Sequence, residues 1–175
     1  MAVIIDATLG GTDSNSYVLL TEADTYFQSR LNVTKWTGAT PDEKNRALVQ
    51  STRRVDYEDF YGSIVDESQA LSFPRNGMGR VNGRLVDGII PRSIKESTYE
   101  LALYMLSVDM SQVGDNNSGL SEYSVKVGSI EETKKYESGG GNEVEDFNDL
   151  PPFVESLLEP FSNTVSSGGV LEVSR

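Results

Sequence analysis

The segment 90–113 constrains the fold of this chain most, because no other stretch has as many apolar side chains at helical spacing. Pro91 suits a first helical turn, and Gly114 is a typical stop signal. The apolar positions between them recur in steps of four and three: Ile94, Thr98, Leu101, Met105 and Val108. A helix that is apolar on nearly every side is covered by others. The sequence therefore predicts a mainly α fold, a small bundle of about four helices around a central helix at 90–113.

Composition narrows the possible functions. The chain has 175 residues, which fits one domain, and its 27 acidic and 15 basic residues give a net charge of −12. That charge disfavours nonspecific attraction to nucleic acid and to anionic membranes. With no cysteine and no histidine, the chain lacks thiolate and imidazole metal ligands and the commonest general base near neutral pH. We therefore expect no enzyme, no cofactor and no metal site.

Two further features concern location and charge. Neither a charged-then-apolar leader nor a run of eighteen apolar residues is present, so secretion and membrane spanning have no support in the sequence. The acidity is concentrated in residues 131–175, which carry ten acids and three bases. We expect an intracellular protein without a membrane partner.

The N-terminal half contains two helix start signals. Residues 1–20 read as an extended arm and a loop, after which Thr21 is a good N-cap for a short helix. Thr40 can cap a second helix, with Glu43 closing a capping box, and this helix is predicted to run to about Phe60. Three arginines of this helix form either a patch for an acidic partner or a solvated face paired with carboxylates: Arg46, Arg53 and Arg54.

A glycine-rich segment follows at 61–90. Asn82-Gly83 is a typical turn, so Arg80 to Val86 is predicted to form a hairpin. The segment lacks the lysine-serine or lysine-threonine pair of a phosphate-binding loop. Phe73-Pro74-Arg75 is predicted to be a fixed kink whose ring is buried against the central helix. The guanidinium of Arg75 then binds a carboxylate or carbonyl groups, or alternatively a ligand.

The C-terminal part is predicted to contain a strand at 120–130, a flexible link at 131–149, a last helix at 150–161 and a tail at 162–175. The apolar side of that helix is assigned to Phe153, Leu157, Leu158 and Phe161. Residues 1–165 are predicted to form a single domain. An exposed strand and an alternating tail can each pair with another chain. The candidate interface residues are Tyr123, Val125, Val127, Val170, Leu171 and Val173.

A longer series of residues carries a family resemblance. It runs in order through Tyr61-Gly62, Gln69 to Arg75, Gly83-Arg84, Ile89-Ile90-Pro91, Glu100-Leu101-Ala102, the stretch 124–130 and the proline-led helix at 150. Over roughly residues 17–165 the chain resembles the head-to-tail connector proteins of tailed bacteriophages, with Phe73 where tryptophan is usual. Some members of that family carry the label "DnaT-like single-stranded-DNA-binding". The structural motif consists of Phe73, Pro74, Arg75, Leu101 and Met105.

The resemblance implies a virion structural protein of the phage neck, made in the host cytoplasm. It would be a head-to-tail adaptor subunit that forms a ring of copies, twelve-fold in the family, beneath the portal protein. The ring would join a stopper or tail-completion protein and let phage DNA pass without tight binding. The alternative, a single-stranded-DNA-binding replication protein, needs a basic groove with stacking aromatic residues. A regulatory or enzymatic domain is a third possibility, for which the sequence offers no residues.

Overall fold

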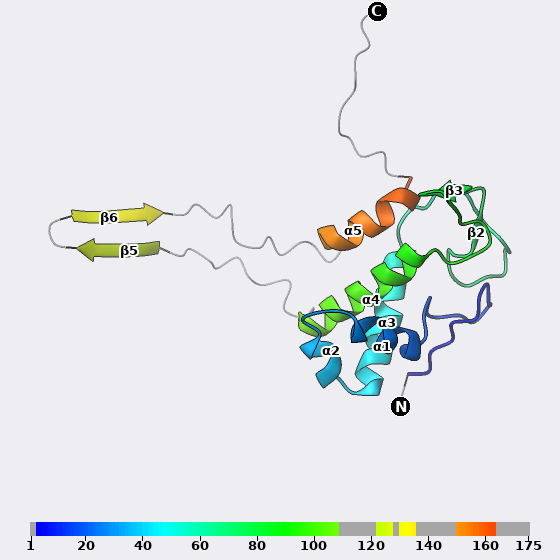
Figure 1. Cartoon of the computed structure of the whole chain (residues 1–175), viewed down its shortest axis with the longest axis horizontal. Coiled ribbons are helices and arrows are strands. Elements are labelled where there is room, and N and C mark those ends of the chain that lie inside the picture. The colour runs from blue at the N-terminus through cyan, green and yellow to red at the C-terminus, as the bar shows by residue number, and fades with distance from the viewer. Residues whose placement is uncertain (1–2, 109–121, 128–129, 136–149, 164–175) are drawn as a thin grey trace, which may run out of the picture. The chain divides into compact units, whose positions relative to one another are not determined.

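A computed structural model describes residues 3–108, 122–127, 130–135 and 150–163 (Figure 1). The chain divides into two compact units, one made of residues 1–108 and 151–175 and the other of residues 109–150. The first is called unit 1 below, and the second unit 2. The described residues are mostly helical with short antiparallel strands, so the predicted mainly α fold is confirmed.

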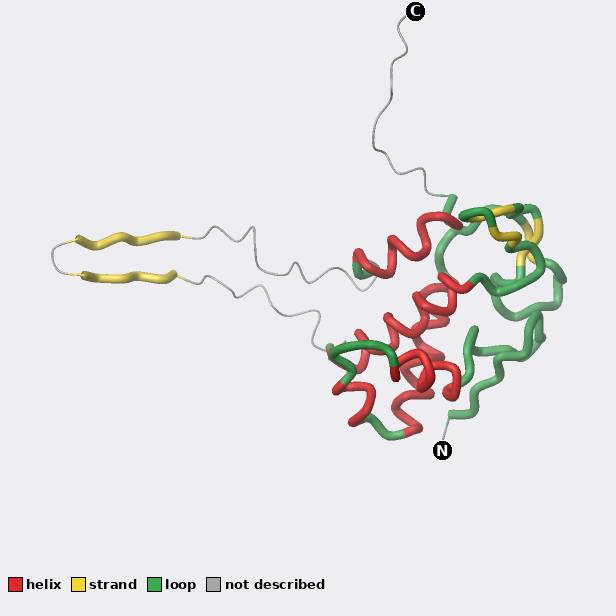
Figure 2. The backbone as a smooth tube through the Cα atoms, in the orientation of Figure 1, coloured by secondary structure: helices red, strands yellow, loops and turns green. Residues whose placement is uncertain are grey.

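Unit 1 contains all the described helices and four short strands. The helices are α1 (Leu20–Gln28), α2 (Thr34–Gly38), α3 (Pro41–Asp56), α4 (Arg92–Ser107) and α5 (Pro152–Leu158), the last followed by the 3₁₀ helix η2 (Glu159–Phe161). The strands pair as β1 (Ser63–Ile64) with β2 (Arg75–Asn76) and β3 (Arg80–Val81) with β4 (Arg84–Leu85). Figure 2 shows the helices of this unit on one side and most of its loops on the other.

The central helix α4 packs against α2, α3 and α5. Ile94 and Leu101 are 0% and 2% exposed, whereas Met105 near the end of the helix is only half-buried. The burial of the first half follows from its apolar steps of three and four, which put these side chains on one face. The helix begins one residue after Pro91, which is the N-cap rather than a first-turn residue. The part of the predicted helix beyond Val108 lies outside the described residues.

The start of α3 confirms its sequence signal. The Thr40 hydroxyl accepts from the Glu43 N–H at 3.3 Å, and the Thr40 N–H donates to a Glu43 carboxylate oxygen at 2.7 Å. The helix ends at Asp56, earlier than the predicted Phe60. Ser72 explains this end, because its hydroxyl donates to the Asp56 carbonyl and thereby supplies a partner for one of the last helical C=O groups.

The N-terminal helices differ from the prediction in two places. Helix α1 begins at Leu20 with Leu19 as its N-cap, so Thr21 lies inside the first turn. Helix α2 occupies a stretch that the sequence indicated to be a connection. Its Trp36 explains the difference, because the indole is 1% exposed and donates its N–H to Asp24 at 2.8 Å. The ring centroids of Trp36 and Phe27 are 4.5 Å apart.

Phe73 is the centre of a second cluster of aromatic rings, and it is 1% exposed. Its ring centroid lies 4.9 Å from Phe60, 5.9 Å from Tyr17 and 6.3 Å from Phe161. The bond between Phe73 and Pro74 is cis. The kink therefore holds together three segments that are distant in sequence: the N-terminal arm, the segment that follows α3, and the 3₁₀ helix η2.

The last helix confirms a prediction in part. Val154, Leu158 and Phe161 are buried, but Phe153 is 46% exposed, so its assignment to the apolar side is wrong. Val154 and Leu158 are four residues apart and therefore share one face of a helix. With only seven residues, α5 has room for this one narrow face against α4.

Unit 2 contains the antiparallel pair β5 (Glu122–Val127) and β6 (Ile130–Lys135). The predicted strand is confirmed over 122–127. Residues 131–135 belong to β6, so the predicted flexible link does not begin there; its remainder, 136–149, lies outside the described residues. The register pairs Glu122 with Lys135 and Lys126 with Glu131.

None of the helices in the described residues is both long and apolar enough to span a bilayer.

Candidate nucleic-acid interface

Most cations on the helices of unit 1 are matched by carboxylates. Over residues 3–108 and 150–163, six of the eleven lysine and arginine side chains form ion pairs. The pairs are Arg30–Glu100, Lys44–Asp24, Arg46–Asp42, Arg54–Glu58, Arg92–Glu96 and Lys95–Glu22. Of the three arginines predicted on α3, two are therefore paired, and Arg53 alone is exposed with no ion pair among these residues. Most of the positive charge on the helices is therefore held in local pairs, with Lys35 and Arg53 as the exceptions in the described residues.

Glu100 is the most buried member of these pairs. Its carboxylate accepts from the Arg30 Nε at 2.8 Å and from the Tyr26 hydroxyl at 2.6 Å. Burial and the Glu100 hydrogen bond raise the pKa of Tyr26. The phenol therefore stays a donor at neutral pH. This network ties α1 to α4 and has both ends satisfied, so its role is structural.

The segment 72–88, here called the arginine loop, holds its cations differently. It carries three arginines and one acid, and within the described part of the chain none of its arginines forms an ion pair: Arg75, Arg80 and Arg84. The lone acid, Asp87, is used by the backbone, because its carboxylate accepts from the N–H groups of Met78 and Gly79 at 2.8 and 2.9 Å. The loop thus has a surplus of positive charge in an acidic chain.

Arg75 is the structural arginine of the loop. It donates to the carbonyl groups of Phe60, Tyr61 and Gly62 at 2.8–2.9 Å. The prediction that this guanidinium binds a carboxylate or carbonyls is confirmed in its carbonyl form. A fork of N–H donors is suited to successive carbonyls. Arg75 fastens the loop to the segment that follows α3. Because its acceptors are neutral and leave its charge uncancelled, it also contributes to the local positive potential.

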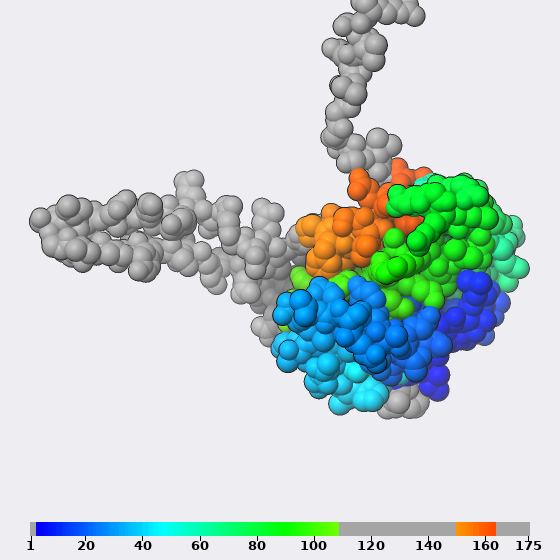
Figure 3. All heavy atoms as spheres, viewed as in Figure 1, coloured from blue at the N-terminus to red at the C-terminus, as the bar shows by residue number. Residues whose placement is uncertain are grey.

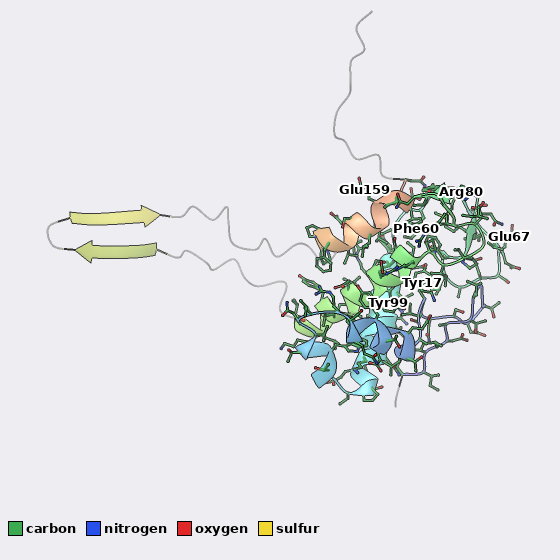
Figure 4. The ribbon with its side chains drawn as sticks, viewed as in Figure 1. Tyr17, Phe60, Glu67, Arg80, Tyr99 and Glu159 are labelled. Carbon is green, nitrogen blue, oxygen red and sulfur yellow. The ribbon has the colours of Figure 1, made fainter. Side chains whose placement is uncertain are left out.

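Arg80 and Arg84 lie on the hairpin β3–β4, as the Asn-Gly signal predicted. Asn82 and Gly83 have φ of 49° and 78°, the positive values that a two-residue I′ turn requires. Both arginines are exposed, and Arg80 donates to the Gly83 carbonyl across the turn at 2.8 Å. The register puts Arg80 opposite Leu85 and Val81 opposite Arg84, so the two arginines lie on opposite faces of a narrow ribbon. Figure 4 shows Arg80 at the margin of unit 1, far from Tyr99.

A cavity of about 400 Å³ lies at the start of α4. Its lining is mainly apolar, and the polar groups in it include Glu22 and Lys95, which pair at 2.7 Å. Burial raises the pKa of Glu22, but hydrogen bonds from the Leu19 N–H and from Lys95, with the lysine charge, lower it overall. Glu22 is therefore ionised and matched. Neither side chain is left for chemistry, and no cluster of metal-ligating side chains occurs in the described residues.

The predicted site residues separate into three groups. Phe73, Pro74 and Leu101 are buried parts of the core, Arg75 is half-buried and bonded to carbonyls, and Met105 is half-buried. The candidate interface residues of unit 2 lie on β5, whose backbone pairs with β6: Tyr123, Val125 and Val127. The tail residues lie outside the described residues: Val170, Leu171 and Val173.

A family model described as "Putative DnaT-like ssDNA binding protein" matches residues 1–175. The chain belongs to this family. No curated protein and no solved structure matches the chain. The DnaT-like family covers the whole sequence, including the arginine loop and both units.

This match overturns the predicted virion function. The head-to-tail adaptor, its twelve-fold ring, its portal and stopper partners and the passage of DNA without tight binding are wrong, because the whole chain matches a family described by single-stranded DNA binding. The physical reason lies in the residues that carried the resemblance. Phe73, Arg75 and Leu101 build the core and fasten a loop, and residues of that kind specify a fold without specifying its partner.

Apart from Arg75, the residues of the arginine loop are not among the predicted site residues, because its basic residues lack the interleaved aromatic residues typical of a single-strand binder. The signal was local charge: residues 72–95 contain five basic residues and one acidic residue in a chain of net charge −12. Over longer segments this local surplus is outweighed by acidic residues.

Proposed function

We propose that this protein binds single-stranded DNA, with Arg80 and Arg84 of the arginine loop as its phosphate contacts. The observation that carries the proposal is that these exposed guanidinium groups have no carboxylate partner in the described residues, whereas the helical cations mostly do. The DnaT-like family membership supports the same function. Arginine is the side chain best suited to phosphate oxygens, because its planar fork binds them in pairs.

The overall charge does not oppose this proposal as strongly as the whole-chain value indicates. Residues 3–108 and 150–163 carry 16 acids and 11 bases, a net charge of −5, and the other residues carry 11 acids and four bases. Within the first group the arginine loop has a net charge of +2. Exposed charges are screened beyond a Debye length of about 8 Å at physiological salt, so a phosphate near the hairpin interacts mainly with the loop.

The shape of the hairpin favours a single strand. Arg80 and Arg84 lie on opposite faces of a ribbon two strands wide, which Figure 3 shows as part of the green surface of unit 1. A flexible single strand can bend round such a ribbon and bring a phosphate to each face. A stiff duplex bends only at a cost, with a persistence length of about 150 base pairs.

The test is a fluorescence anisotropy titration of the full-length protein with a labelled oligo(dT) at low salt. We expect saturable binding, weaker binding to a duplex of equal length, and a loss of at least about tenfold in affinity for the double variant Arg80→Glu, Arg84→Glu. Lys35→Glu is the matched control, since Lys35 is also exposed without an ion pair in the described residues and lies on α2, away from β3 (Figure 1). An equal loss in the control variant, or no saturable binding by the wild type, would refute the proposal.

A further inference from the structure

Tyr57 is the most exposed aromatic side chain in residues 3–108 and 150–163. It is 86% exposed, whereas Phe153, the next most exposed aromatic residue there, is 46% exposed. The ring centroids of Phe153 and Tyr104 are 6.3 Å apart. The aromatic pairs of these residues leave Tyr57 out. Packing within unit 1 therefore gives no account of this ring. Single exposed apolar residues are common, so its surroundings decide whether it has a role.

The surroundings of Tyr57 join it to the arginine loop. Ser72 is the first residue of that loop, and its hydroxyl donates to the Asp56 carbonyl at 3.3 Å. This carbonyl belongs to the peptide bond between Asp56 and Tyr57. The Ser72 carbonyl accepts from Arg75 at 3.4 Å. Ser72 thus links the peptide group between Asp56 and Tyr57 to the Arg75 guanidinium through these two hydrogen bonds. Arg75 also donates to the carbonyls of Phe60, Tyr61 and Gly62, so the loop is fastened to the segment that follows Tyr57.

Arg53 adds a cation beside this ring. It precedes Tyr57 by four residues, and Tyr57 as C-cap still has helical backbone angles, so both side chains lie on one face of α3. Arg53 is exposed and has no ion pair in the described part of unit 1. The acids nearby have other partners: Asp56 accepts from Tyr17 and Ser72, and Glu58 pairs with Arg54. The ring and this cation are both open to a ligand.

We infer that Tyr57 is a base-stacking residue of the interface, with Arg53 as a further phosphate contact beside it. This inference rests on the proposed function and adds the group that recognises an unpaired base. An aromatic face stacks on any base, and such stacking is worth roughly 1–3 kcal/mol per base in single-strand binders, which is about 5- to 150-fold in affinity. In a duplex the bases are stacked on each other and their faces are covered. A stacking tyrosine thus makes the interface selective for single strands.

The test compares oligo(dT) with an abasic oligonucleotide of equal length, which keeps the phosphates and lacks the bases. We expect the wild-type protein to prefer oligo(dT) by about 5- to 150-fold, Tyr57→Ala to lose most of that preference, and Tyr57→Phe to keep it. The affinity of Tyr57→Ala for the abasic strand should equal that of the wild type. Phe153→Ala is the control, an exposed aromatic residue on α5 whose removal should leave the preference unchanged.

The outcomes separate the two claims. If the wild type binds neither oligonucleotide, the proposed function fails, and this inference fails with it. If the wild type binds and Tyr57→Ala keeps the full preference for bases, single-strand binding stands and the stacking role of Tyr57 is wrong. If Tyr57→Ala loses equal affinity for both strands, its effect is structural and the inference is likewise refuted.

Discussion

The helices of unit 1 and the arginine loop differ in what their cations face. Lys44 and Lys95 on the helices, and Arg30 just after α1, each pair with a carboxylate of another helix. Arg46 and Arg92 pair with a carboxylate on their own helix, and Arg54 pairs with Glu58 just beyond the end of α3. In the loop, the Arg75 side chain donates to backbone carbonyls and the Arg80 side chain to one turn carbonyl, while the Arg84 side chain has no hydrogen bond or ion pair in the described residues. The total number of cations in a region is therefore a poor guide to a nucleic-acid site. The number of cations that have no carboxylate partner is a better guide.

The largest expected effect comes from unfolding the helices that carry the arginine loop. Leu101→Asp places a charge at a position that is 2% exposed, and we expect it to cost about 4 kcal/mol or more of unfolding free energy. Single-strand binding should disappear together with the folded state. Thermal melting followed by circular dichroism measures the loss. Met105→Asp, on the same helix but half-buried, is the control and should melt cooperatively at a moderately lower temperature; equal behaviour of the two variants would contradict the core assignment.

A smaller change separates structural charge from binding charge. Glu100→Gln removes the charge that joins Tyr26 and Arg30, and we expect a cost of about 1–2 kcal/mol, since Arg30 is 42% exposed and is rehydrated in part. The affinity for oligo(dT) should not change. Chemical denaturation measures the free energy of unfolding. The control is Glu96→Gln, because Glu96 pairs with Arg92, which is 77% exposed; this variant should lower the free energy of unfolding by at most about 0.5 kcal/mol. A marked change in DNA affinity for Glu100→Gln would show that helical charge also contributes to binding.

Local signals in the sequence predicted much of the fold. The Thr40 to Glu43 capping box, the Asn82-Gly83 turn and the buried face of α4 are each determined by neighbouring residues, and each is confirmed. Helix α2 could not be predicted in this way, because Trp36 is held by Phe27 and Asp24 from another helix. The early end of α3 likewise depends on Ser72, sixteen residues beyond Asp56.

The candidate site was harder to predict than the fold. Arg80 and Arg84 are visible in the sequence as hairpin residues, but whether a carboxylate lies near them depends on how the chain folds. Asp87 illustrates this, because its sequence position lies close to both arginines while its carboxylate is used by the N–H groups of Met78 and Gly79. The exposure of Tyr57 also follows from tertiary structure, since the sequence placed it inside a longer helix.

The salt dependence of single-strand binding tests the central claim most directly. Each phosphate neutralised on a single strand contributes about 0.7 to the slope of log affinity against log salt concentration. If Arg80 and Arg84 each contact a phosphate, the variant Arg80→Gln, Arg84→Gln should have a slope smaller by about 1.4, and its melting temperature should be unchanged. Lys35→Gln should leave the slope unaltered. A wild-type slope in the Arg80→Gln, Arg84→Gln variant would contradict the assignment of the arginine loop as the DNA interface.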